Sequence, residues 1–178
     1  MVLDACVLAN YGVANLLLLL AEKPRLYLPF WSETILGETW KTQTQQLGWD
    51  QGIADSFKTE LSKAFPEAMV DGFEYLIEQC TNDTKDRHVL ACAIHCKAEV
   101  LLTFNLRDFP ERSLSQWGIT AKHPQDYLLT LFALEPLHVM QQLGGIAQKR
   151  GCTLEDHLID LGRFMPAFSS HLLDELNS

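Results

Sequence analysis

The 178-residue chain is 47% hydrophobic and 21% charged, proportions typical of one compact soluble domain with a modest appendage. Its formal net charge of −9 argues against a protein that grips nucleic acid over a broad basic face. An enzyme that binds nucleic acid through a cation remains compatible with this charge, because carboxylates that await a metal make the formal count more negative.

The sequence favours a cytoplasmic protein without a membrane partner. Its longest apolar run, residues 13–21, is interrupted by Asn15 and is shorter than the roughly 20 residues that span a bilayer. Asp4 lies where a signal peptide would carry its basic region. The five cysteines are odd in number and follow no paired pattern, which predicts reduced thiols.

Hydrophobic periodicity and punctuating residues predict short strands that alternate with helices. The strands are expected at residues 1–4, 25–30, 99–104 and, as a short edge strand, 118–123. The helices are expected at 11–23, 33–48 after the N-cap Ser32, 50–65 and 84–98, whereas 67–80 fits either a helix or a strand with turns. This alternation predicts an α/β fold with a parallel sheet and helices on both faces.

The character of the chain changes after Pro124. Four amphipathic segments follow, and Thr153 with Asp156 resembles a capping box at the start of one of them. We therefore predict an α/β domain over residues 1–123 and a helical C-terminal extension over 124–178.

Four acidic residues lie at strand ends or beside apolar segments of the predicted sheet. They are Asp4, Glu38, Asp86 and Asp108. Each has a simple structural explanation when taken alone: a turn, an N-cap, a solvated helix face or a loop. Ligands of open parallel sheets bind beyond the carboxyl ends of the strands, where these acids would meet. A hard cation such as Mg²⁺ or Mn²⁺ would relieve their mutual repulsion.

Four stretches occur in the order and setting of PIN-domain ribonucleases: VLDACVL, SETILGE, DRHVLACA and LLTFNLRDF. The chain resembles most closely the VapC-type toxins of prokaryotic toxin–antitoxin pairs. The resemblance covers roughly residues 1–123, and DRHVLACAIHCKAEVLLTFNLRDFP is its most specific part. The helical tail resembles the extension of one VapC subgroup more loosely.

The resemblance assigns a role to individual positions. Asp4, Glu38, Asp86 and Asp108 match the catalytic and metal-binding acids of the family, with Thr103 and Asn105 as supporting residues. Cys6 stands where many PIN domains have Ser, Thr or Asn, and Asn105 stands where many have Asp. The amide removes one charge from the site and puts a second metal in doubt.

The resemblance implies a Mg²⁺- or Mn²⁺-dependent hydrolase that cleaves RNA to 5′-phosphate and 3′-hydroxyl ends. It also implies a cognate antitoxin and a homodimer. Arg87, Arg107 and Lys41 are candidate phosphate contacts, and Lys85 is a weaker one, although salt bridges to neighbouring acids explain the arginines equally well. Trp31 is a candidate for base stacking, with a core role the more frequent one for such a residue.

Three other interpretations stay open. His88, Cys92, His95 and Cys96 share one predicted helix, a spacing compatible with a Zn²⁺ site but without a second ligand pair. A phosphatase using Asp4 as nucleophile would require an acid at position 6, where Cys6 stands. A catalytically weak PIN scaffold that acts through a partner is the alternative that Cys6 and Asn105 keep open.

Overall fold

A computed structural model describes residues 1–177, which divide into two compact units. The first unit contains Met1–Asn10 and Leu28–His123, and the second contains Tyr11–Tyr27 and the chain from Pro124 onward. The segment Tyr11–Tyr27 therefore groups with the C-terminal helices rather than with the sheet. The functional division into 1–123 and 124–178 stays a prediction.

The first unit is built on a parallel sheet of three strands in the order β1-β2-β3. The strands are β1 (Val2–Leu3), β2 (Val100–Leu102) and β3 (Thr120–Lys122). Leu3 pairs with Leu102, which in turn pairs with Lys122, so the carboxyl ends of all three strands meet at one edge. The predicted α/β fold class and the edge strand near residue 120 are confirmed.

The predicted strand at residues 25–30 is wrong as a continuous element. Only isolated bridges form there, between Phe30 and Val2 and between Trp31 and Met69. Pro29 lacks an amide hydrogen and so cannot donate to a ladder, which limits pairing in this segment. Phe30 still accepts a hydrogen bond from the Leu3 amide at 3.0 Å, and this segment therefore runs beside β1.

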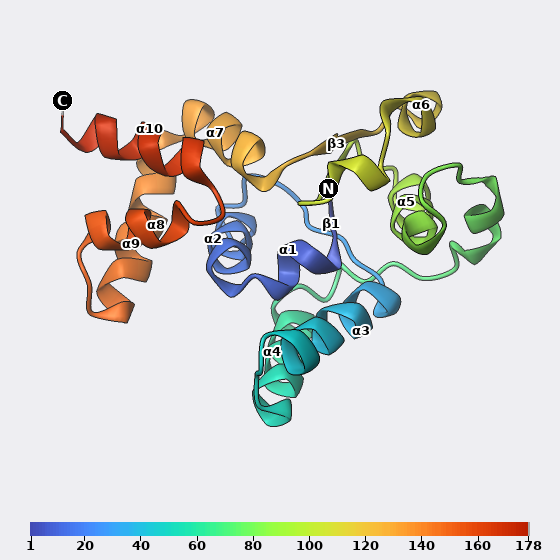
Figure 1. The fold of residues 1–178 in the computed structure, drawn as a ribbon, viewed down its shortest axis with the longest axis horizontal. Coiled ribbons are helices and arrows are strands. Elements are labelled where there is room, and N and C mark those ends of the chain that lie inside the picture. Colours follow the sequence, from blue (N-terminus) through green and yellow to red (C-terminus); the bar gives the residue numbers. More distant parts are fainter. Residues whose placement is uncertain (178) are drawn as a thin grey trace. The chain divides into compact units, whose positions relative to one another are not determined.

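Helices make up much of the rest of the first unit (Figure 1). They are α1 (Ala5–Ala9), α3 (Glu33–Lys41), α4 (Gln51–Ala64), α5 (Arg87–His95) and α6 (Glu111–Leu114). A π-helical turn, Thr42–Gln46, continues α3 almost to the predicted end at residue 48. Short 3₁₀ turns lie at Glu74–Gln79, Thr84–Asp86, Leu106–Asp108 and Ser115–Trp117, the first resolving the ambiguous segment 67–80. Ser32 caps α3 as predicted, since its hydroxyl oxygen accepts from the Ile35 amide at 3.3 Å.

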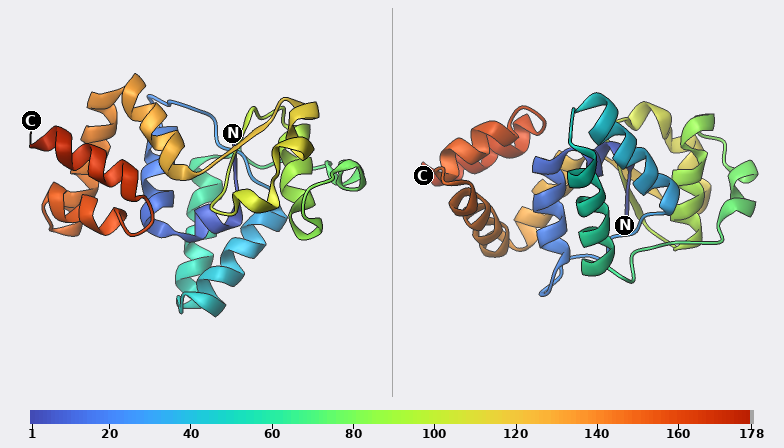
Figure 2. Two further views of the ribbon diagram at one scale, coloured as in Figure 1. Left: turned by 45° about the horizontal axis from the view of Figure 1, so that its top comes forward. Right: turned by 90° about the horizontal axis from the view of Figure 1, so that it is seen from below.

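The second unit is helical (Figure 2). It contains α2 (Tyr11–Ala21), α7 (Pro124–Leu134), α8 (Pro136–Arg150), α9 (Leu154–Leu161) and α10 (Pro166–Leu176). The predicted capping box at Thr153 and Asp156 is present at the start of α9. Helix α2 packs against α8 with an almost wholly buried leucine-rich face.

Within residues 1–177, every helix is too short or too polar to cross a membrane.

Candidate metal-dependent active site

Asp4 occupies the junction between β1 and α1 and is only 5% exposed. Its Oδ1 caps α1 by accepting a hydrogen bond from the Ala5 amide at 2.7 Å. Its Oδ2 accepts a hydrogen bond from the Thr103 hydroxyl at 2.7 Å, across from β1 to the end of β2. Thr103 therefore holds the carboxylate of Asp4 in place, while the supporting role in an active site that the resemblance implies for it stays a prediction.

Cys6 takes part in the same hydrogen-bond cluster. Its thiol donates to Asp4 Oδ2 at 3.1 Å, and its sulfur accepts from the Phe104 amide at 3.4 Å. Burial, and then the negative charge of Asp4, raise the pKa of the Cys6 thiol to about 12. The side chain therefore stays a neutral donor, and the departure from Ser, Thr or Asn keeps a polar support for Asp4.

Asp86 ends the 3₁₀ turn Thr84–Asp86 and directly precedes α5. It makes no capping hydrogen bond to that helix, whereas Asp83 caps the turn by accepting from the Lys85 amide at 3.2 Å. Burial, and then the negative charges of Asp4 and Asp108, raise the pKa of Asp86 to about 6. Since such charge effects require proximity, Asp4 and Asp108 both lie in the neighbourhood of Asp86.

The turn that carries Asp108 is joined to the turn that carries Asp86. The Asp83 amide donates to the Asp108 carbonyl oxygen at 3.1 Å, and Lys85 Nζ lies 3.8 Å from Asp108 Oδ2. Asn105 is exposed at the start of the Asp108 turn, and its backbone amide donates to Thr103 Oγ1 at 3.0 Å. Its backbone thus orders the end of β2, while a role for its side chain stays a prediction.

Glu38 lies on α3 with a 40% exposed side chain. Its Oε2 lies 3.1 Å from Nε2 of His88, a residue in the first turn of α5. Burial lowers the pKa of His88, but the hydrogen bond to Glu38 and its negative charge outweigh that effect and leave the pKa raised. Sequence reasoning considered His88 only as a zinc ligand and missed this pairing, because nothing in the spacing of residues 38 and 88 indicates contact.

The candidate phosphate contacts differ in their surroundings. Lys41 and Arg107 are exposed, whereas Arg87 is turned toward the backbone, with its Nε 3.5 Å from the Asn82 carbonyl oxygen. Their contact with substrate stays a prediction. Trp31 is fully buried and stacks edge-on against Phe65 with ring centroids 5.8 Å apart, so it belongs to the core.

The donor chemistry of the acids fits a hard divalent cation. The negative charges of Asp4 and Asp108 contribute to the raised pKa of Asp86, and Mg²⁺ or Mn²⁺ prefers such oxygen ligands. Among residues 1–177, no three Cys, His, Asp or Glu side chains are arranged closely enough to hold an ion together. An ion at this edge would therefore be held through one or two carboxylates and water, the usual manner of Mg²⁺.

A comparison with curated proteins found one relative. The chain is 37% identical over 94 residues to "Putative ribonuclease VapC50" of Mycobacterium tuberculosis. Over these residues this chain is homologous to that VapC protein. The matched part is 53% of this chain and 47% of the VapC50 protein, so the chain matches about half the length of its curated relative. The resemblance to VapC-type PIN proteins is thereby confirmed. No family model and no solved structure matches the chain.

Proposed function

We propose that this VapC homologue is a metal-dependent endoribonuclease that hydrolyses RNA phosphodiester bonds. The observation that carries the proposal is the position of Asp86 near two other acids: burial first, and then the negative charges of Asp4 and Asp108, raise its pKa. Asp4 directly follows β1, and Asp108 lies in the turn after β2, at the side of the sheet where α/β enzymes bind ligands.

Asp4, Asp86 and Asp108 would supply the ligands for one or two Mg²⁺ or Mn²⁺ ions, each held through one or two carboxylates and water, with Glu38 completing the site or orienting the attacking water. A bound ion of this kind lowers the pKa of water and stabilises the leaving oxygen. The chain's own residues prepare the acids for that task. Thr103 and Cys6 fix the Asp4 carboxylate, and His88 restrains Glu38.

The proposed biological role rests on the VapC relative and not on the geometry of the acidic residues. We propose that the chain is the toxin of a type II toxin–antitoxin system, acting in the cytoplasm as a homodimer. Its partner would be a small antitoxin that covers the acidic edge. Support comes from the VapC relative and from a net charge of −9, which favours a basic covering segment.

The direct test is cleavage of single-stranded RNA with Mg²⁺ or Mn²⁺ by the wild type, Asp4→Asn and Asp86→Asn. We expect products with 5′-phosphate and 3′-hydroxyl ends from the wild type and a loss of at least about 100-fold in each variant. Asp71→Asn, at an exposed acid of the same unit, is the control for the change in charge and should cleave normally.

Two outcomes would contradict the proposal. A wild type that is inactive with both metals would favour the alternative of a catalytically weak PIN scaffold that acts through its partner. Equal cleavage by Asp4→Asn and wild type would place the active site elsewhere.

A further inference from the structure

A second site lies in the first unit, beside the turn that carries Asp108. It is a cavity of about 620 Å³ between α6, the 3₁₀ turns next to it and strand β3. That volume falls within the range of roughly 300–1,000 Å³ that small-molecule sites occupy. Leu106, two residues before Asp108, lies at its rim with 41% exposure, so the cavity adjoins the proposed catalytic edge.

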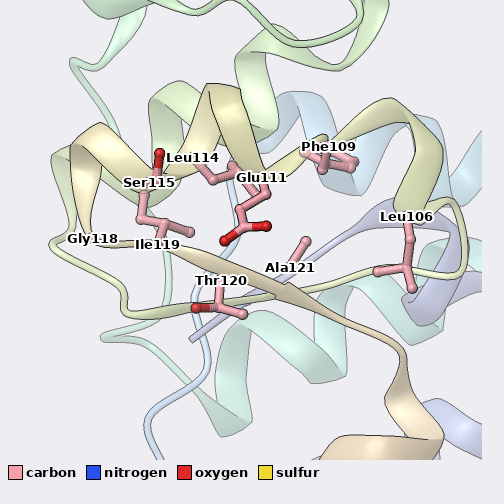
Figure 3. A pocket seen from close by; sticks show the side chains of 9 residues that line it. All are labelled: Leu106, Phe109, Glu111, Leu114, Ser115, Gly118, Ile119, Thr120 and Ala121. Atoms are coloured by element: carbon pink, nitrogen blue, oxygen red, sulfur yellow. The ribbon is translucent and has the colours of Figure 1, made fainter.

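The cavity has a mixed lining, with an apolar floor, the hydroxyls of Ser115 and Thr120, and one carboxylate, that of the exposed residue Glu111. Phe109, Leu114 and Ile119 line it and are themselves nearly fully buried, which makes them a rigid apolar floor. Figure 3 shows the carboxylate of Glu111 projecting from α6 into the cavity toward β3 and Thr120. A carboxylate that projects over an apolar floor favours a flat ligand that brings N–H donors.

Strand β3, the last strand in the sheet order, forms part of the cavity wall. Thr120 and Ala121 both line it, although successive side chains of a strand point to opposite faces. The Thr120 amide bonds to the Glu99 carbonyl at 2.9 Å and the Lys122 carbonyl accepts from the Thr103 amide at 3.1 Å, so residues 120 and 122 face β2. The alternation of a parallel ladder then leaves the N–H and C=O of Ala121 on the free edge, available to a ligand.

Basic residues neighbour several lining residues in sequence, although the whole chain carries −9. Arg107, Arg112 and Lys122 follow the lining residues Leu106, Glu111 and Ala121 in sequence, and both arginines are exposed. A ligand with an uncharged aromatic body and attached phosphates would complement this distribution. A nucleotide of single-stranded RNA has those features.

We propose that this cavity binds a guanine base of the RNA substrate, with Glu111 as the residue that selects it. Guanine presents two parallel N–H donors, N1–H and N2–H, which match the two oxygens of one carboxylate. Adenine and cytosine place a ring acceptor beside their amino group, and uracil places carbonyls on both sides of its single N–H. Each of these edges opposes one carboxylate oxygen with another acceptor. The inference rests on the proposed ribonuclease function and names the base that this site would recognise.

The test is equilibrium binding of fluorescent RNA 12-mers in EDTA, which separates recognition from cleavage. Three oligonucleotides differ at one central position, which is guanine, inosine or adenine in a background of cytosine and uracil. Inosine lacks only the N2 amino group. For the wild type we expect guanine to bind roughly 5- to 150-fold more tightly than adenine, with inosine in between.

Glu111→Gln should bind all three oligonucleotides alike, because an amide offers one acceptor and one donor in place of two acceptors. Glu78→Gln is the matched control, an identical change at an exposed glutamate of the same unit, and it should keep the preference for guanine.

The outcomes separate this inference from the proposed function. A guanine preference that depends on Glu111 supports the inference even if no metal restores cleavage, in which case only the nuclease proposal fails. Cleavage and binding that are indifferent to the central base overturn the inference and leave the nuclease proposal intact. Unchanged RNA binding by Glu111→Gln, together with a loss of binding to a co-expressed partner protein, would assign the cavity to protein recognition and likewise overturn it.

Discussion

The acids at the sheet edge differ in how firmly the protein holds them. Asp4 accepts hydrogen bonds from Ala5, Cys6 and Thr103, so its two oxygens are fixed before any ligand arrives. Asp86 makes no capping bond to α5 and bears the repulsion of its neighbours. Preorganisation at one acid and unrelieved repulsion at another are typical of a site that is completed by a cation.

The raised pKa of Asp86 predicts a pH dependence of stability in the metal-free protein. Its pKa is about 6 in the folded state against an ordinary value of 3.8, so folding favours the neutral carboxyl. This contribution is complete below about pH 3.8 and is lost as the pH rises through 6. In EDTA, Asp86→Asn should therefore have a higher urea midpoint than the wild type at pH 7.5 and an equal one near pH 4.

The exposed Asp71→Asn serves as the control, and it should gain nothing at pH 7.5. An Asp86→Asn variant that is less stable than the wild type at pH 7.5 would show that Asp86 stabilises the fold by a contact that outweighs the repulsion.

At the level of elements, the parts that sequence predicts well are those with a strong local signal. Ser32 before an amphipathic run gave the start of α3, and the apolar segments that end in Asp4 and Thr103 gave two strands. The strand predicted for residues 25–30 was wrong, because the apolar side chains of this segment reflect its packing beside β1. The segment forms only isolated bridges and no continuous strand.

The candidate site was predictable to a similar degree. Acids that end strands can be placed at one edge from the order of a parallel sheet, and family resemblance adds their roles. The contact between Glu38 and His88 was not predictable, because it depends on how α3 and α5 are placed in three dimensions. Likewise, no local pattern predicts that α2 groups with helices more than 100 residues later in the chain.

The grouping of α2 with the C-terminal helices predicts that the segment after residue 123 is not dispensable. Val13, Leu16, Leu17 and Leu20 of α2 are all fully buried, and α2 packs against α8. Burial of such a side chain is worth about 1.5–3 kcal/mol, and the stability of a whole domain is about 5–15 kcal/mol. A fragment of residues 1–123 should therefore aggregate or unfold without cooperativity, as measured by size-exclusion chromatography and urea unfolding.

The comparison is a fragment of residues 1–164, which loses α10 but keeps α8 as the cover of α2. It should stay more soluble than the shorter fragment. Cooperative unfolding of residues 1–123 with the midpoint of the full chain would instead establish the sheet-bearing part as an autonomous domain.

At the scale of the whole molecule, the negative net charge limits where RNA can bind. A chain with 23 acidic and 14 basic residues is expected to repel RNA over most of its surface. Substrate binding is then expected to depend on local neutralisation, by arginines such as Arg107 and Arg112 and, when metal is present, by a cation at the acidic edge. Divalent metal should consequently affect folding stability as well as catalysis.

This dependence gives a measurement that needs no RNA. A ligand that binds only the folded state at 100 times its Kd stabilises it by about 2.7 kcal/mol. For a chain of this size that corresponds to an increase in Tm of roughly 5–10 °C. We expect saturating Mn²⁺ or Mg²⁺ to raise the Tm of the wild type by this amount. Asp4→Asn and Asp86→Asn should show little increase, because each lacks one of the converging charges.

Potassium chloride at matched ionic strength controls for general screening of the net charge, and Asp71→Asn controls for the removal of one exposed acid. Both controls isolate binding at the acidic edge from the response of a protein with a charge of −9 to added salt. An equal rise in Tm for wild type, Asp4→Asn and Asp86→Asn would place the bound metal away from these acids. It would thus separate the acidic edge from the metal on which the proposed chemistry depends.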